Sequence, residues 1–387
     1  MSCGAITCPI NNMGFLAIIS RQVRKNILPL PFQYIKEKMK RSITIISMLL
    51  AFASVFSSCS TKVDLYADYK EIPVIYGLLD NTKDTNYVKI IRAFSGSDES
   101  SVNANEVALI PDSNNYPGKL DARIYEEKST YTGGSYNPTG RVFELDTMTI
   151  HDKEPGDFYS PDQKVYYTTE RFLADNGNTK YRYRLEVIIK GDTVSATSNI
   201  VGGDRFYVTT NIVDLDPTST TASKVKFLGA ENAYVYELKM QFNYKETHSG
   251  QETKNKKVEW SLGTYNTNEM DFSEFGNFKE FEVSYKHEAL FNMLNNKIDA
   301  DTANVERLIG DLNILIAAGG SELYNYIEVN APSTSISQNI SDYTNINGGY
   351  GVFSSRINIS QSVKISPNTI TALIGKSGWG FKQDLGE

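Results

Sequence analysis

The chain has 387 residues, 40% hydrophobic and 22% charged, which is typical of a globular protein and excludes a disordered or collagen-like one. Its length favours two domains, because single cores usually stop growing at about 250 residues. The first 58 residues hold seven basic residues and one acid, which leaves 32 basic and 45 acidic residues in the remainder, a net charge of −13. Such an acidic body repels phosphate, which argues against nucleic acid and anionic lipid head groups as partners.

The first interpretable segment is an export signal at residues 39–58. Met39-Lys-Arg is a short cationic start, and a 14-residue apolar run, Ile43–Phe56, follows it. A membrane-spanning helix needs about 20 apolar residues, so this run has the length of a signal-peptide core. Residues 1–38 fit no such signal, and we interpret them as a gene-start extension that is not native.

The signal ends in Phe56-Ser-Ser-Cys59, which resembles the lipobox of Bacteroidota lipoproteins. Small residues precede the cysteine there because the signal peptidase must cut beside a thiol that carries diacylglycerol. We therefore predict that Cys59 is lipidated and that the lipid anchors the chain in the outer membrane, with the body on either its periplasmic or its extracellular face. Residues 59–69 are predicted to be a polar tether. The alternative is an ordinary secretory signal. No cysteine follows Cys59, which excludes a disulfide framework and a cysteine metal cluster.

Strand patterns begin after the tether. Two β-branched and aromatic runs, 72–79 and 87–94, are separated by turn-forming residues and predict paired strands. Pro73 favours an edge or first position for the start of the first run. Residues 95–118 are predicted to be a long loop with at most one short helix. A strand at 120–126 and a second loop at 127–140 follow it.

The clearest pattern of this half is Tyr181–Ile189, where alternate residues are aromatic or apolar. Gly191-Asp192 turns the chain into a second alternating run at 193–200. This closing hairpin resembles the last two strands of immunoglobulin-like domains. We therefore predict a mainly β chain whose first domain, residues 70–203, is an immunoglobulin-like β-sandwich.

The second half, residues 204–387, predicts a β-rich α+β domain with short helices. Its strongest strand runs from Tyr234 to Tyr244, where six alternate positions are aromatic or apolar. The other predictions are a partner strand at 258–262, a helix within 285–299, a buried strand at 308–317, a capped helix at 321–327, a strand at 356–359 and a final turn around Trp379.

Three short motifs together resemble a family of uncharacterised Bacteroidota outer-membrane lipoproteins, known only as a domain of unknown function. They are Pro73–Asp80 (PVIYGLLD), Tyr87–Phe94 (YVKIIRAF) and Asn345–Phe353 (NINGGYGVF), and the likeness covers most of residues 60–387. The resemblance implies an outer-membrane address, often beside a TonB-dependent transporter. It implies no catalytic residue.

No catalytic motif is complete. His287-Glu288 begins like a zincin helix, but Phe291 stands where the second histidine is needed, so we interpret His287 as a solvated helix residue. Gly375–Trp379 misses the spacing of a serine-hydrolase elbow. Gly348–Gly351 lacks the spacing of a dinucleotide loop and predicts a tight strand entry instead. We therefore expect no enzyme activity, no metal and no cofactor.

Acid pairs are harder to exclude, because a glycosidase needs only two carboxylates at a suitable separation. The same residue type also binds Ca²⁺, although no EF-hand spacing occurs. We interpret the candidate acids as residues of polar turns. The candidates for a glycosidase are Asp152, Glu154 and Asp157, or Asp214 with Asp216; the candidates for Ca²⁺ are Asp214 with Asp216, or Asp80 with Asp84.

Aromatic residues are the one compositional excess, with 24 Tyr and 18 Phe. Most lie on the apolar faces of predicted strands, where rings form a core. Tyr116, Tyr131 and Tyr136 instead fall in predicted loops, and we predict them as contacts for a sugar or a protein partner.

The leading hypothesis is a non-enzymatic cell-envelope lipoprotein with a role in binding or assembly, beside an outer-membrane TonB-dependent transporter. One alternative is a surface glycan-binding module, which predicts a line of exposed tyrosines. The other is a surface hydrolase, which predicts two carboxylates about 5–10 Å apart in an open cleft.

Overall fold

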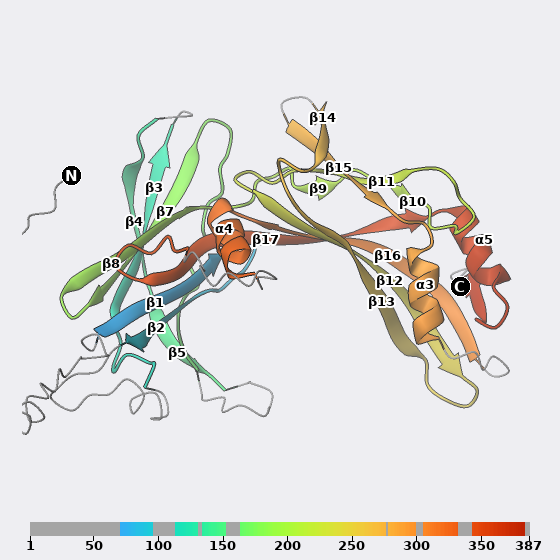
Figure 1. Ribbon diagram of the computed structural model, residues 1–387, viewed down its shortest axis with the longest axis horizontal. Helices are drawn as coiled ribbons and strands as arrows, with labels where there is room; N and C mark the ends of the chain where they lie inside the picture. The colour runs from blue at the N-terminus through green and yellow to red at the C-terminus, as the bar shows by residue number, and fades with distance from the viewer. Residues whose placement is uncertain are drawn as a thin grey trace, which may run out of the picture. The chain divides into compact units, whose positions relative to one another are not determined.

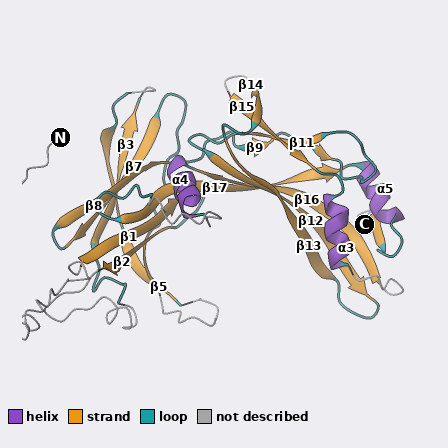
Figure 2. Ribbon diagram, in the orientation of Figure 1, coloured by secondary structure: helices purple, strands orange, loops and turns teal. Residues whose placement is uncertain are grey.

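The computed structural model describes residues 70–95, 113–130, 134–151, 163–275, 278–298, 305–331 and 343–383. The chain from Tyr66 onward forms one compact unit. Its described part is mainly β with three helices (Figure 1, Figure 2), which confirms the predicted fold class. None of the described helices is long and apolar enough to cross a membrane. The predicted extension, signal peptide and tether, with Cys59, lie outside the described residues, as does most of the predicted loop at 95–118.

The first body is a sandwich of two sheets. Its strands follow the orders β1-β2-β6-β5 and β4-β3-β7-β8, with antiparallel neighbours throughout. These are the orders A-B-E-D and C′-C-F-G of an immunoglobulin-like domain, which confirms the predicted sandwich. The bounds are β1 (Lys70–Leu79), β2 (Asn86–Ser95), β3 (Asp121–Ser129), β4 (Asn137–Glu144), β5 (Asp146–Ile150), β6 (Gln163–Thr168), β7 (Lys180–Ile189) and β8 (Asp192–Asn199).

A buried tyrosine fixes the loop that enters β7. The Tyr183 side chain is fully buried among the inward side chains of both sheets. Its hydroxyl accepts a hydrogen bond from the Leu173 amide at 2.7 Å and lies 3.0 Å from a carboxylate oxygen of buried Glu126. This hydroxyl-to-backbone bond is the tyrosine corner of immunoglobulin-like domains. Burial raises the pKa of Tyr183, so the phenol keeps its proton and can donate to Glu126.

The strand β17 (Tyr350–Ile365) contributes to both bodies. Its first six residues pair in parallel with β1, and its later part pairs antiparallel with β16 (Val305–Gly319). Pro73 lies just before the parallel pairing begins, where β1 has only β2 beside it. Gly351 has a φ of +110°, and a Cβ atom there would overlap the carbonyl oxygen of Ile75. The tight strand entry predicted for this glycine cluster is therefore confirmed.

The second body combines a sheet of long strands, a smaller sheet and helices α3 and α5, while α4 lies where β17 passes from one body to the other. The long strands have the order β13-β12-β16-β17, with β18 beside β16 and β10 beside β17, and the smaller sheet has the order β14-β15-β11-β9. Helix α3 packs on β13, and α4 packs on β17. The bounds are β9 (Tyr207–Val208), β10 (Ile212–Val213), β11 (Ser223–Leu228), β12 (Val235–His248), β13 (Lys254–Asn266), β14 (Asp271–Phe275), β15 (Phe278–Tyr285), α3 (Ala289–Lys297), α4 (Ser321–Asn330), α5 (Pro367–Gly375) and β18 (Phe381–Gln383).

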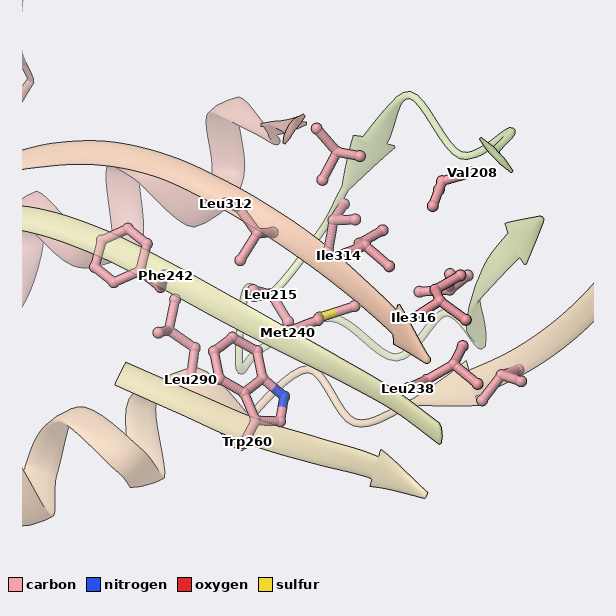
Figure 3. Close-up of a cluster of buried hydrophobic side chains, with 14 of the residues drawn as sticks. Val208, Leu215, Leu238, Met240, Phe242, Trp260, Leu290, Leu312, Ile314 and Ile316 are labelled. Atoms are coloured by element: carbon pink, nitrogen blue, oxygen red, sulfur yellow. The ribbon is translucent and has the colours of Figure 1, made fainter. Parts of the chain in front are cut away.

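The inward side chains of β12 form the centre of the second core. Leu238, Met240 and Phe242 are each fully buried, as their alternation along the strand predicts. Figure 3 shows them with side chains from β13 and α3, such as Trp260 and Leu290. No described residue is a cysteine, so packing and polar contacts hold this body together.

Several elements differ from the sequence predictions. No strand is predicted for β4, β5 or β6, although all three pair with neighbours in the sandwich. Helix α4 continues to Asn330, beyond the predicted end at Ile327, and β17 is far longer than the predicted strand at 356–359. Two residues from beyond 203, Ile346 and Phe353, join the core of the first body. Pairing with distant strands, rather than local pattern, sets the extent of these elements.

Candidate functional site

Tyr116 does not lie on the surface as predicted. Its side chain is 6% exposed and belongs to the core of the sandwich, so its prediction as an exposed loop residue is wrong. Burial raises the pKa of Tyr116 to about 12, with a further contribution from the charge of Glu71. The guanidinium of Arg92 lies 5.8 Å from the centre of the ring. A loop residue can belong to the core when the loop packs against the sheet, and the neighbouring sequence alone does not predict such packing.

The other two predicted tyrosines differ from Tyr116. Tyr131 lies outside the described residues. Tyr136 is half-buried at the start of the segment that enters β4, and the guanidinium of Arg182 lies 4.4 Å from the centre of its ring. Arg182 also binds the Glu127 carboxylate. One face of Tyr136 is therefore already occupied by a cation from its own sheet.

Three of the predicted acids, Asp214, Asp216 and Asp80, accept hydrogen bonds from other groups of the fold. Asp214 accepts hydrogen bonds from the hydroxyls of Ser366 at 2.5 Å and Thr369 at 3.1 Å, beside the first turn of α5. Burial works to raise the pKa of Asp214, but these hydrogen bonds outweigh it and lower the pKa. Asp216 and Asp80 each accept from the backbone amide two residues later, which is the geometry of a polar turn. Asp152, Glu154 and Asp157 lie outside the described residues.

His287 is not the solvated helix residue that the sequence predicts. It precedes α3, is 7% exposed, and its Nε2 lies 2.6 Å from the carbonyl oxygen of Thr221. The ring also contacts Tyr285, with 5.6 Å between ring centres. Within the described part of the chain, no group of three or more His, Cys, Asp or Glu side chains is placed to hold a metal ion.

A hydrolase would need a pair of carboxylates in a cavity, and carboxylates line two cavities of the described structure. One of about 720 Å³ lies between β10, β16 and β17, and Asp311 is the one carboxylate among its lining residues. A smaller one of about 250 Å³ has Asp175, Asp204 and Glu231 on its wall. The carboxylates of Asp175 and Glu231 lie 3.3 and 3.4 Å from the ammonium of Lys180. Burial works to lower the pKa of Lys180, but the two carboxylates outweigh it and raise the pKa, so the three groups form an ion-pair cluster.

An aromatic surface that the sequence analysis missed lies on the outer face of the first body. Four neighbouring strands, β17-β1-β2-β6, each place one tyrosine on this face, and we call these four residues the tyrosine band: Tyr350, Tyr76, Tyr87 and Tyr167. Residues directly opposite in paired strands share a face. Val74 is opposite Tyr350, Tyr76 is opposite Lys89, and Tyr87 is opposite Tyr167.

The rings of the tyrosine band are accessible and one of them is held in place. Tyr76, Tyr87 and Tyr350 are 38%, 44% and 45% exposed, and Tyr167 is half-buried. Tyr326 of α4 meets Tyr76 edge-on, with 6.0 Å between ring centres and 3.3 Å between the two hydroxyl oxygens. The hydrogen bond from Tyr76 is the largest cause that raises the pKa of Tyr326 to about 12. Figure 1 shows α4 lying against β17, next to β1.

A second aromatic surface lies on the hairpin of β14 and β15 (Figure 1). Phe272 and Phe275 of β14 are 48% and 53% exposed, and we call these two residues with Phe278 the phenylalanine hairpin. Every residue of β14 is exposed, and β14 is the edge strand of its sheet. The Lys279 ammonium lies 4.3 Å from the centre of the Phe272 ring. No described strand pairs with the outer edge of β14, and an exposed apolar edge of this kind favours pairing with another chain.

The chain matches no protein-family model and no curated protein. The resemblance of the three motifs to a lipoprotein family, and the export signal, stay predictions.

Proposed function

We propose that the chain is a non-enzymatic lipoprotein of the cell envelope, anchored by a lipid on Cys59, with a binding or assembly role beside an outer-membrane TonB-dependent transporter. The lipobox supports the anchor, and the acidic, cysteine-free remainder fits a body that stays in aqueous solution beside the membrane. The resemblance of three motifs to Bacteroidota outer-membrane lipoproteins supports the transporter as the partner.

The phenylalanine hairpin is the observation that carries the proposed binding role. The outer edge of β14 has backbone groups that no described strand pairs with, and Phe272 and Phe275 offer apolar area beside them. An edge of this kind accepts an extended segment from another protein, which adds a strand while its side chains cover the rings. The proposed occupant is an extended segment of the transporter, because the anchor keeps the body at the same membrane.

The hydrogen bonds and ion pairs of Asp175 and Asp214 argue against the hydrolase alternative. A retaining or inverting glycosidase needs one carboxyl to act as an acid and a second to act as nucleophile or base. Asp175 is held by the Tyr181 amide at 2.8 Å and the Asn232 amide at 3.0 Å, in addition to Lys180. Asp214 is held by the hydroxyls beside α5. Carboxylates with these contacts serve the fold.

The test is co-purification of the anchored chain with a TonB-dependent transporter of the same outer membrane, from membranes extracted in mild detergent. We expect the wild-type chain to elute with the transporter. The double change Phe272→Ser and Phe275→Ser is expected to reduce the retained fraction by about tenfold or more, because it removes the exposed ring on each face of β14 that an added strand would cover.

The matched control is Ile374→Ser, which changes another exposed apolar side chain, 46% exposed, on α5. It should leave the retained fraction unchanged. Elution of the wild-type chain without the transporter, or equal retention of wild type and the double variant, would contradict the proposal. Circular dichroism of each variant checks that the fold is kept.

A further inference from the structure

The tyrosine band has a composition that differs from the phenylalanine hairpin. The exposed large apolar side chains on β1, β2 and β17 are all tyrosines, namely Tyr76, Tyr87 and Tyr350. Each ring combines an apolar face with a hydroxyl that keeps hydrogen bonding in water. The buried centre of a protein–protein interface favours side chains without polar groups, such as the phenylalanines of the hairpin. The band instead suits a ligand that is itself apolar on one face and hydroxylated at its edges.

The charged residues on and around this face restrict the class of ligand that can bind there. The outward residues of β1, β2 and β6 and of the part of β17 that pairs with β1 include no Asp or Glu, although the chain after residue 58 has a net charge of −13. Lys89 lies between Tyr76 and Tyr87 on this face, and its ammonium donates to the amide oxygen of Gln163 at 2.6 Å. Two carboxylates lie beside the band: Asp146 of β5 is directly opposite Tyr167, and Glu322 of α4 accepts a hydrogen bond from Ser354 of β17. These negative charges repel an acidic ligand, so the face fits a neutral ligand that is rich in hydroxyl groups.

The geometry of the band sets the length of the ligand. Tyr350, Tyr76 and Tyr87 follow a diagonal, since each step moves one strand across and two residues along. Diagonal neighbours of this kind are about 7–8 Å apart. The three tyrosines therefore span about 15 Å, which is longer than one sugar ring and needs an extended chain.

We propose that the tyrosine band is a binding platform for a neutral, extended oligosaccharide, whose sugar rings stack on Tyr350, Tyr76 and Tyr87. Tyr326 orients the central ring through its edge-on contact and hydroxyl contact with Tyr76, so less freedom is lost on binding. Lys89 and Gln163 supply polar atoms beside the rings. This platform is separate from the phenylalanine hairpin and does not depend on the transporter.

The test is isothermal titration of the full-length chain, purified in detergent, with cellohexaose and with cellotriose. We expect cellohexaose to bind, and cellotriose to bind about tenfold more weakly or less, because the shorter chain cannot cover all three rings. Tyr76→Ala and Tyr87→Ala are each expected to weaken binding of cellohexaose by about tenfold or more. Tyr76→Phe and Tyr87→Phe keep the ring and should retain most of the binding.

Tyr207→Ala is the matched control, because Tyr207 is 41% exposed on β9 and lies outside the band. It should bind cellohexaose as the wild-type chain does. Absence of binding to cellohexaose at millimolar concentration, or equal loss in Tyr207→Ala and Tyr76→Ala, would overturn the proposal. Loss of transporter co-purification in Tyr76→Ala without any sugar binding would instead assign the band to a protein partner and would also overturn it.

Discussion

Replacement of Glu246 by glutamine is expected to lower the free energy of unfolding by about 3–5 kcal/mol, because it leaves a buried cation without its counter-charge. Arg307 on β16 is 2% exposed, and its Nε lies 2.8 Å from a carboxylate oxygen of Glu246 on β12. One of its terminal nitrogens donates to the carbonyl oxygen of Trp379 at 2.7 Å. This one side chain therefore ties the sheet of the second body to the C-terminal turn.

The pair also predicts a pH dependence. Burial works to raise the pKa of Glu246, but the hydrogen bond and charge of Arg307 outweigh it and hold the pKa below its ordinary value. A carboxyl with a lowered folded-state pKa contributes stability above its unfolded pKa of about 4.3 and loses that contribution as the pH falls through the folded value. The difference in unfolding free energy between wild type and Glu246→Gln should therefore shrink as the pH falls from about 7 to about 3.

Urea unfolding, followed by tryptophan fluorescence, measures both effects. Glu306→Gln is the matched control, because Glu306 precedes Arg307 on β16 and pairs with Lys382 at 2.7 Å while both side chains are largely exposed. This change should cost less than about 1 kcal/mol. A similar small cost for Glu246→Gln would contradict the role assigned to the buried pair.

Gly351→Ala is the second change with a large expected effect, about 2–6 kcal/mol. It combines a left-handed backbone, at about 1–3 kcal/mol for a residue with a side chain, with overlap between the new Cβ and the Ile75 carbonyl, at about 1–3 kcal/mol. The overlap falls within the parallel pairing of β1 and β17, which links the tyrosine band to the rest of the sheet. Binding of any ligand at the band should therefore weaken together with stability.

Urea unfolding again gives the readout for Gly351→Ala. Gly375→Ala at the end of α5 is the control, because no atom lies within 4 Å of a Cβ placed there. The control should change the unfolding free energy by less than about 1 kcal/mol. Equal stability of Gly351→Ala and wild type would show that β17 and β1 are not held in this close register.

Local pattern predicts the elements whose two faces differ sharply. The alternation of Tyr234–Tyr244 predicts β12, and Tyr181–Ile189 predicts β7, because burial on one side of a strand demands apolar residues at every second position. Strands such as β4 have mostly exposed residues, so no periodic signal marks them. Helix α5 is absent from the sequence predictions, although Ser366, which caps it by accepting from the Thr369 amide, and Pro367 at its first position are a helix-start signal.

The tyrosine band was only partly predictable. Tyr87 alternates with the buried Val88 and Ile90, which already places Tyr87 on an outer face of its strand. Tyr350 joins the band through pairing with a strand more than 270 residues earlier in the chain, and no local pattern reports such a partner. The same limit explains Tyr116, whose burial depends on how its loop packs onto the sandwich.

The envelope role depends first on the anchor at Cys59. The most direct measurement is mass spectrometry of the N-terminal peptide of the chain isolated from cell membranes. We expect a peptide that begins at Cys59 and carries diacylglycerol on its thiol, and Cys59→Ser should release the chain from the membrane fraction. A mature chain that begins at another residue, or an unmodified Cys59 in a chain found free of membranes, would contradict it.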